Sequence, residues 1–255
     1  MRRLLFALLL VSLFGRDIAA AAPICTPPGS EEFRYSWRLR GALSWIAAIR
    51  FPTRGSGELK NEYSESGSID TQLKITGEGD PGFYLYHSIL DDRSGRTMMT
   101  YHGYSFGKKS HNEQANFDYV KRLVRIREEK TGQVREKVKP IPAGQLRDVL
   151  TGIHYLRQNA MTIAAPLRTD IYSDGKLYPV VFKPQGRETI LVGKKSVASR
   201  TYVIAAAPEE GKKWPGAVKV WLSEDAGRVP LRIEMQHSFA TLRLDLESAE
   251  ACLLR

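Results

Sequence analysis

Strict alternation of apolar and polar residues is the most regular pattern along the chain. In residues 31–40, every second position from Phe33 to Leu39 is apolar, and the positions between them are polar. A period of two with one polar face is typical of strands in an antiparallel sheet that is buried on one side. The pattern therefore predicts half-buried strands at four places. These are 31–40, 68–76, 228–236 and 240–247.

Shorter or less regular apolar runs predict further strands between these four. Segments rich in glycine, aspartate and serine separate the runs, at 79–82, 91–95, 173–175 and 224–227. Such residues favour tight turns, and strands at this short spacing suit a meander of hairpins. The weaker strand candidates are 43–51, 82–90, 96–101, 115–127, 176–182, 189–192, 199–206 and 217–222.

One segment, 145–158, has the period of a helix instead. Its apolar residues are Leu146, Val149, Leu150, Ile153 and Leu156. This spacing predicts an amphipathic helix whose apolar stripe packs on the sheet. No internal repeat and no long linker divides the chain. The expected fold is therefore mainly β, an antiparallel sheet with one amphipathic helix packed on it.

The N-terminus carries the pattern of a cleavable secretory signal. A positive start, Met1–Arg3, precedes an uncharged run over residues 4–14, which is shorter than the 20 or so residues of a membrane-spanning helix. Ala19–Ala22 then offers a small-residue cleavage site, most simply after Ala20, with Ala21 or Ala22 as alternatives. We therefore expect export to the periplasm. The expected organisation is a signal peptide over 1–20, an N-terminal tail over 21–30, a single β-rich domain over 31–248 and a C-terminal tail over 249–255.

Two cysteines, Cys25 and Cys252, lie near opposite ends of the expected mature chain. In an oxidising compartment they are candidates for a disulfide that joins the two tails. The alternative is a pair of unbridged thiols. Cys25 also leaves lipid modification open, although Ile24 before it is a poor match for the small residue that usually precedes a lipid-modified cysteine.

Charge narrows the choice of partners. Without residues 1–20, which hold three of the 38 basic and one of the 28 acidic residues, the formal charge is +8. A basic surface outside the cytoplasm favours an anionic membrane surface or acidic wall polymers rather than nucleic acid. A solvated basic face without a specific partner explains the charge equally simply.

The sequence offers little catalytic chemistry. Gly103–Gly107 matches G-x-S-x-G, the turn that exposes a nucleophilic serine in some hydrolases, here Ser105. The polar segment after it lacks a helical stripe, so a glycine-flanked turn is the simpler interpretation. Lysine-rich turns at 107–110 and 193–196 do not match a phosphate-binding loop, and the histidines lack metal-ligand spacing. We therefore predict no catalytic residue, no metal and no cofactor.

Aromatic and aliphatic residues gather on one face of the predicted strands. They form ordinary core or, alternatively, the floor of a concave apolar cavity, because a curved sheet with one helix need not fill itself. The candidate ligand-lining residues are Phe33, Tyr35, Trp37, Trp45, Ile69, Leu73 and Ile75.

Several segments together resemble a bacterial envelope family known as domain of unknown function 3108. They are Phe33–Trp37, Asn116–Tyr119, Asp148–Arg157, Gly175–Tyr178, Gly186–Ile190 and Val220–Ile233. The resemblance implies an exported, mostly periplasmic protein with a curved antiparallel sheet, a half-open barrel, and brings no reaction or cofactor with it. More loosely, such half-barrels are similar to the lipoprotein carriers of the Lol system, which hold acyl chains against a concave sheet.

Arg157 and Arg228 match recurring positions of that family. Their role there is either a structural contact or the binding of a ligand. We expect a non-enzymatic envelope protein that binds an apolar ligand, such as a lipid, or a partner chain on its concave sheet. The alternative is a structural or interaction protein of the envelope without a small ligand. A serine hydrolase that uses Ser105 is a remote third.

Overall fold

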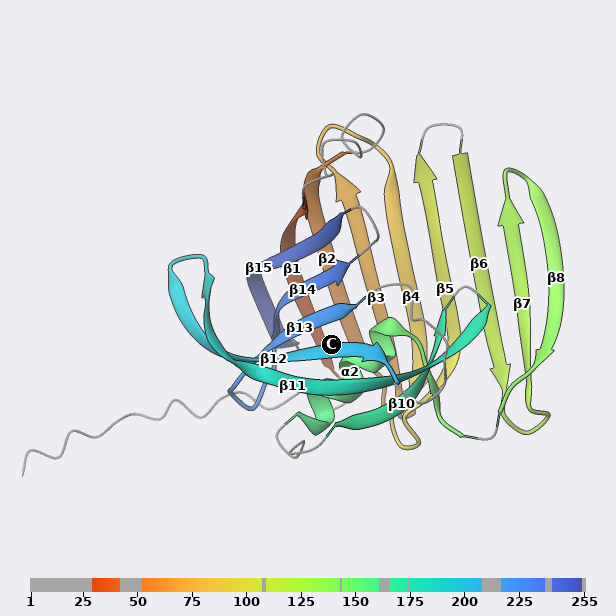
Figure 1. Ribbon diagram of the computed structural model, residues 1–255. Helices are drawn as coiled ribbons and strands as arrows, with labels where there is room; N and C mark the ends of the chain where they lie inside the picture. The colour runs from red at the N-terminus through yellow and green to blue at the C-terminus, as the bar shows by residue number, and fades with distance from the viewer. Residues whose placement is uncertain are drawn as a thin grey trace, which may run out of the picture.

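A computed structural model describes residues 29–41, 52–106, 109–142, 144–160, 166–173, 175–207, 217–236 and 240–253. All strands in these ranges belong to one sheet (Figure 1), with the order β8-β7-β6-β5-β4-β3-β2-β1-β15-β14-β13-β12-β11-β10-β9. The first eight are β1 (Gly29–Arg40), β2 (Arg54–Tyr63), β3 (Ser68–Gly77), β4 (Phe83–Asp91), β5 (Arg96–Phe106), β6 (Lys109–Asp118), β7 (Leu123–Lys130) and β8 (Gln133–Pro140). They are followed by β9 (Leu146–Arg147), helix α2 (Val149–Asn159), β10 (Leu167–Ser173), β11 (Lys176–Val192), β12 (Lys195–Ala206), β13 (Val218–Ser223), β14 (Pro230–Gln236) and β15 (Thr241–Leu253).

The sheet is a largely antiparallel meander in which the first and last described strands of the chain pair with each other. β1 pairs with β15, so the first and last described strands lie side by side, and the pairing runs from Ser30 opposite Leu253 to Arg40 opposite Thr241. Pairing thus extends slightly beyond the expected 31–248 at both ends. The two edges of the sheet are β8 and the short β9, which pairs in parallel with β10.

The curved sheet wraps around α2 without closing into a barrel. In Figure 1, β1–β8 form a broad wall, β10–β15 curve back across it, and α2 lies between the two parts. This confirms the predicted fold class, a curved antiparallel sheet with one helix packed on it. In the described part of the chain, no helix is long and apolar enough to cross a membrane.

A second apolar cluster lies where the two parts of the open sheet approach each other. Phe117 on β6 and Ile126 on β7 are buried against Leu146 on β9 and Tyr172 on β10, with the Phe117 and Tyr172 rings perpendicular at 5.1 Å. Side chains, not backbone hydrogen bonds, therefore seal this seam. β8 continues past it, with all of its residues exposed.

Helix α2 begins later than its apolar stripe predicted, and the reason is a cap. Asp148 accepts a hydrogen bond from the Thr151 amide at 2.7 Å, and the Thr151 hydroxyl accepts one from the Asp148 amide at 2.8 Å. This reciprocal pair fixes the helix start, so Leu146 falls in β9 instead. Gly152 allows close approach to β10, since a Cβ there would lie 2.9 Å from Ile171 Cδ1.

Several strand expectations need correction. The separately predicted strands 176–182 and 189–192 form one continuous strand, β11. The predicted single strand 115–127 is interrupted by a turn that divides β6 from β7. The sequence pattern missed β2, β8 and β10 as strands. The predicted strand 43–51 lies outside the described residues.

Candidate functional site

A buried ion pair holds α2 against the sheet. The Arg157 guanidinium, 1% exposed, donates to both carboxylate oxygens of Glu31 at 2.8 and 2.9 Å, and Glu31 is 2% exposed. Asn61 and Tyr63 also donate to Glu31, each at 2.9 Å. Burial acts to raise the pKa of Glu31, but the hydrogen bonds and charge of Arg157 outweigh it and hold the pKa below its usual range.

Arg228 completes this anchor from the turn before β14. Its guanidinium donates to the carbonyl oxygens of Arg157 at 2.5 Å and Gln158 at 2.8 Å. In return, Arg157 Nε donates to the Arg228 carbonyl at 3.0 Å. The last turn of α2 is therefore capped by a cation, as helix C-termini favour. Of the two roles left open for these arginines, the structure shows the structural one.

Most of the predicted ligand-lining residues lie in packed core. Trp45 falls outside the described residues. The other six are buried, and all but Ile69 share one cluster with the apolar stripe of α2. Their exposed fractions are Phe33 0%, Tyr35 1%, Trp37 7%, Ile69 1%, Leu73 3% and Ile75 2%.

Leu73 differs from the rest because it also lines a cavity. This cavity, about 170 Å³, lies at the N-terminal end of α2, between the helix and the inner faces of β3–β5. Asp148 at its base accepts a hydrogen bond from Ser88, and burial raises the Asp148 pKa. The cavity is mostly apolar and aromatic. Its lining includes Leu73, Tyr86, His102, Leu150, Tyr172 and Met235.

An aromatic surface extends from this cavity across β4, β5 and β6; we call it the aromatic wall. It consists of Tyr84, Tyr86, His102, Tyr104 and His111. Cross-strand pairing brings these residues onto one face of the sheet. Neighbouring rings lie 5.7 to 6.4 Å apart. All five are at least partly exposed, so the wall is a surface that α2 does not cover.

Sequence reasoning missed this wall although a signal was present. It placed the ligand-lining residues on 31–40 and 68–76, where the apolar alternation is strongest, with Trp45 on the weaker segment 43–51. Tyr84 and Tyr86, and likewise His102 and Tyr104, are spaced by two in the weaker segments. That spacing puts each pair on one face of its strand.

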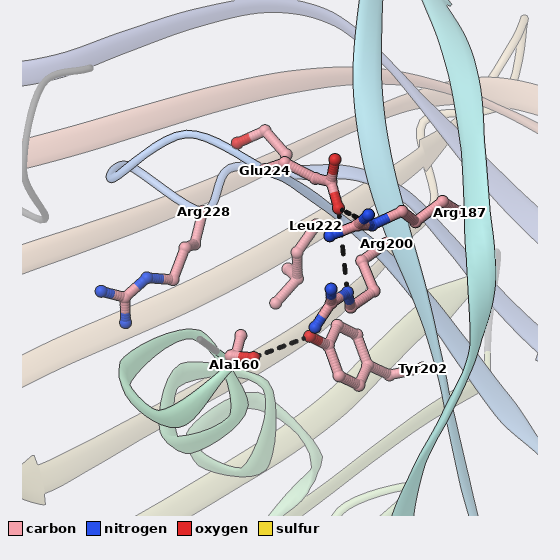
Figure 2. A pocket seen from close by; sticks show the side chains of 8 residues that line it. Ala160, Arg187, Arg200, Tyr202, Leu222, Glu224 and Arg228 are labelled. Carbon is pink, nitrogen blue, oxygen red and sulfur yellow. Dashed lines mark hydrogen bonds and ion pairs between the residues drawn. The ribbon is translucent and has the colours of Figure 1, made fainter. Parts of the chain in front are cut away.

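A second pocket, about 150 Å³, lies at the C-terminal end of α2 (Figure 2). Arg187 Nε lies 2.6 Å and Arg200 Nε 3.8 Å from Glu224 Oε1. The Tyr202 hydroxyl on the pocket floor donates to the Ala160 carbonyl at 3.0 Å. The pocket therefore combines a buried floor with a rim on which two arginines share one carboxylate.

The Ser105 segment does not form a nucleophile turn. Ser105 lies within β5, opposite Phe83 and Ser110 on the neighbouring antiparallel strands. Alternation along a strand places it on the opposite face from Tyr104 and its partner His111. Among the described residues, no group of three His, Cys, Asp or Glu side chains could hold a metal ion.

The cysteine pair remains a prediction. Cys25 lies outside the described residues, and so does the side chain of Cys252, although the Cys252 backbone belongs to β15. β1 begins at Gly29 beside the end of β15.

The geometry defines a class of protein: an open, curved antiparallel sheet around one helix, with an aromatic concave surface. The chain belongs to the family described as protein of unknown function (DUF3108), whose sequence model matches residues 51–247. It is also similar in fold to a solved beta-barrel-like protein of domain of unknown function DUF1849 from Brucella abortus. The TM-score is 0.58 at 10% identity, over 89% of this chain and 99% of that one. No curated protein matches the sequence significantly.

Proposed function

We propose that this protein is an exported, non-enzymatic envelope protein that binds an apolar ligand, such as a lipid chain, on its concave face. The observation that carries the proposal is the continuity of the cavity beside α2 with the aromatic wall. Tyr86 and His102 belong to both. The expected secretory signal and the resemblance to an envelope family support a location in the envelope.

The shape and chemistry of the cavity favour a chain-like ligand. At about 170 Å³, it is smaller than the roughly 300–1,000 Å³ of pockets that enclose a drug-sized molecule. It is large enough for the end of an apolar chain, whose remainder would lie along the aromatic wall. Tyrosine rings provide rigid apolar area with a polar edge for water, and Leu73, Leu150 and Met235 supply aliphatic contacts.

Titration of the purified protein with a fluorescent fatty acid tests the proposal. Val149 lines the cavity and is half-buried. Val149→Phe should therefore fill part of the cavity and weaken binding by about tenfold. The larger side chain should lower the free energy of unfolding by at most about 3 kcal/mol. Val138→Phe is the matched control, because Val138 lies on exposed β8 and is 60% exposed. Absence of saturable binding, or equal effects of both variants, would contradict the proposal.

An interaction role without a small ligand is the second candidate, and β8 is the observation that favours it. Within the described chain β8 pairs only with β7, so its other edge presents unpaired backbone groups that an extended partner segment could join. Crosslinking in the periplasm followed by purification discriminates the two, because only this role requires a fixed protein partner at β8.

A further inference from the structure

The arginine-lined pocket at the C-terminal end of α2 takes no part in apolar binding, since it lies at the opposite end of the helix from the cavity. We propose that this pocket binds a phosphate group, carried either by a small phosphorylated compound or by a lipid headgroup. The inference goes beyond the proposed function and does not depend on it.

The first argument is the placement of two like charges. Arg187 on β11 and Arg200 on β12 are direct cross-strand partners. Two cations in this position repel each other and destabilise a sheet. Glu224 contacts both guanidinium groups, but one carboxylate does not balance two cations, so the pair keeps a net positive charge that a further anion would neutralise.

The second argument is the balance of charge. Glu224 is the carboxylate that lines the pocket, and it is shared between Arg187 and Arg200. Two other nearby carboxylates, those of Glu188 and Asp225, accept hydrogen bonds from other groups. Glu188 lies on the opposite face of β11, where it accepts from Thr201 and Trp221. Asp225 accepts from the amides of Gly227 and Arg228 in its own turn.

Arg228 also lines the pocket and adds positive potential to it, and its buried Nε has no hydrogen-bond partner in the described part of the chain. Its guanidinium points away from those of Arg187 and Arg200 in Figure 2 and is bonded to carbonyls of α2. The main contacts to a ligand would therefore come from Arg187 and Arg200.

The C-terminal end of a helix normally repels anions, but here its carbonyls are covered. Those of Arg157 and Gln158 accept from Arg228, and that of Ala160 accepts from Tyr202. The floor formed by Tyr202 and Leu222 is buried, each residue being 1% exposed. A charge interaction above such a floor is screened less than one in open water.

Phosphate is the anion that best fits these donors. Each guanidinium presents several N–H groups in a planar fork that matches two phosphate oxygens. A volume of about 150 Å³ accepts a small group rather than a folded partner. Binding would displace the Glu224 carboxylate, since both anions compete for the same two arginines.

Calorimetric titration in phosphate-free buffer tests the inference with three probes: inorganic phosphate, glycerol 3-phosphate, and phosphatidylcholine vesicles with and without phosphatidylglycerol. The expected result is saturable one-site binding of at least one phosphate-bearing probe. Binding of the two soluble probes indicates a small phosphorylated compound, whereas binding only of the phosphatidylglycerol vesicles indicates a headgroup. No binding of any probe overturns the inference.

Two substitutions with opposite expected effects give the decisive comparison. Arg200→Gln should weaken binding by about tenfold or more, because it removes charge-assisted hydrogen bonds. Glu224→Gln should tighten it by about threefold or more, because it removes the competing carboxylate. Arg125→Gln, at an exposed position of β7, is the control and should change nothing. Equal weakening by the Arg125 and Arg200 variants, or loss of binding in Glu224→Gln, would show general charge attraction and overturn the assignment.

Discussion

At the scale of single residues, the buried polar groups around α2 determine how the helix is held. Glu31 has the same strand parity as Phe33 and Tyr35 and so faces the core, where an unpaired carboxylate would be very costly. Arg157 lies on the inner side of the helix, after Leu150 and Ile153. There its guanidinium donates to the Glu31 carboxylate. The sequence contained this signal, a carboxylate in apolar register and an arginine ending an apolar stripe. Pairing the two across 126 positions required the fold.

Arg157→Met tests the pair. It leaves Glu31 buried without its cation, and we expect a loss of about 3–5 kcal/mol in the free energy of unfolding by urea. The double variant with Glu31→Gln should recover part of that loss, because no buried charge remains. Arg34→Met, in the exposed pair with Glu32, should have little effect. Small, equal losses at Arg34 and Arg157 would mean that the buried pair does not anchor the helix.

His154 gives a pH-dependent prediction. Burial, aided by the nearby Arg157 charge, lowers the pKa of His154 to about 3 from 6.5. Below about pH 6.5 His154 is therefore protonated in the unfolded chain but stays neutral in the folded protein. The free energy of unfolding falls as the pH drops toward 3. Between about pH 7.5 and pH 5, His154 should lower the free energy of unfolding by about 2 kcal/mol. Urea titrations at both values should show the loss in the native protein and not in His154→Met.

The matched control is His87, whose pKa is raised by its hydrogen bond to Asp70. Its contribution to stability is present below about pH 6.5 and is lost as the pH rises through the raised value. His87→Gln should therefore leave the acid-side loss in place. A native protein whose stability is the same at both pH values as that of His154→Met would contradict the burial of a neutral imidazole.

At the scale of elements, hydrophobic periodicity predicted the strands that are buried on one face and missed the strands that lack a regular apolar face. β1, β3 and β15 each have one apolar and one polar face, so their alternation is visible in the sequence. β8 is exposed throughout and therefore has no apolar face. β2 carries Gly57 and Asn61 on its inner side, where the Asn61 amide donates a hydrogen bond to Glu31. Such strands are specified by their neighbours rather than by their own pattern.

The packing of α2 on the sheet is tested by truncating its stripe. Ile153 is 4% exposed and lies in the main apolar cluster, so Ile153→Ala should cost about 2–5 kcal/mol in the free energy of unfolding. Gln158→Ala, at an exposed position of the same helix, should cost far less. If both changes cost equally little, α2 does not pack as described.

At the scale of the whole molecule, the pairing of β1 with β15 brings both ends of the described chain together, which the sequence alone did not reveal. This supports the proposed disulfide between Cys25 and Cys252. Closing nearly the whole mature chain would stabilise it by roughly 4–5 kcal/mol. Protein from the periplasm should resist alkylation until it is reduced, and should weigh two hydrogens less than the dithiol. Free labelling of both thiols without reductant would contradict the bridge.

The curvature of the sheet around one helix leaves the aromatic wall as its open inner surface, and we propose that the apolar ligand binds there. Native mass spectrometry of the mature protein, isolated from the envelope without detergent, tests it most directly. We expect a species heavier than the polypeptide, with the extra mass removed by organic extraction and diminished in Val149→Phe. A single species at the polypeptide mass in both proteins, with no uptake of added fatty acid, would contradict it.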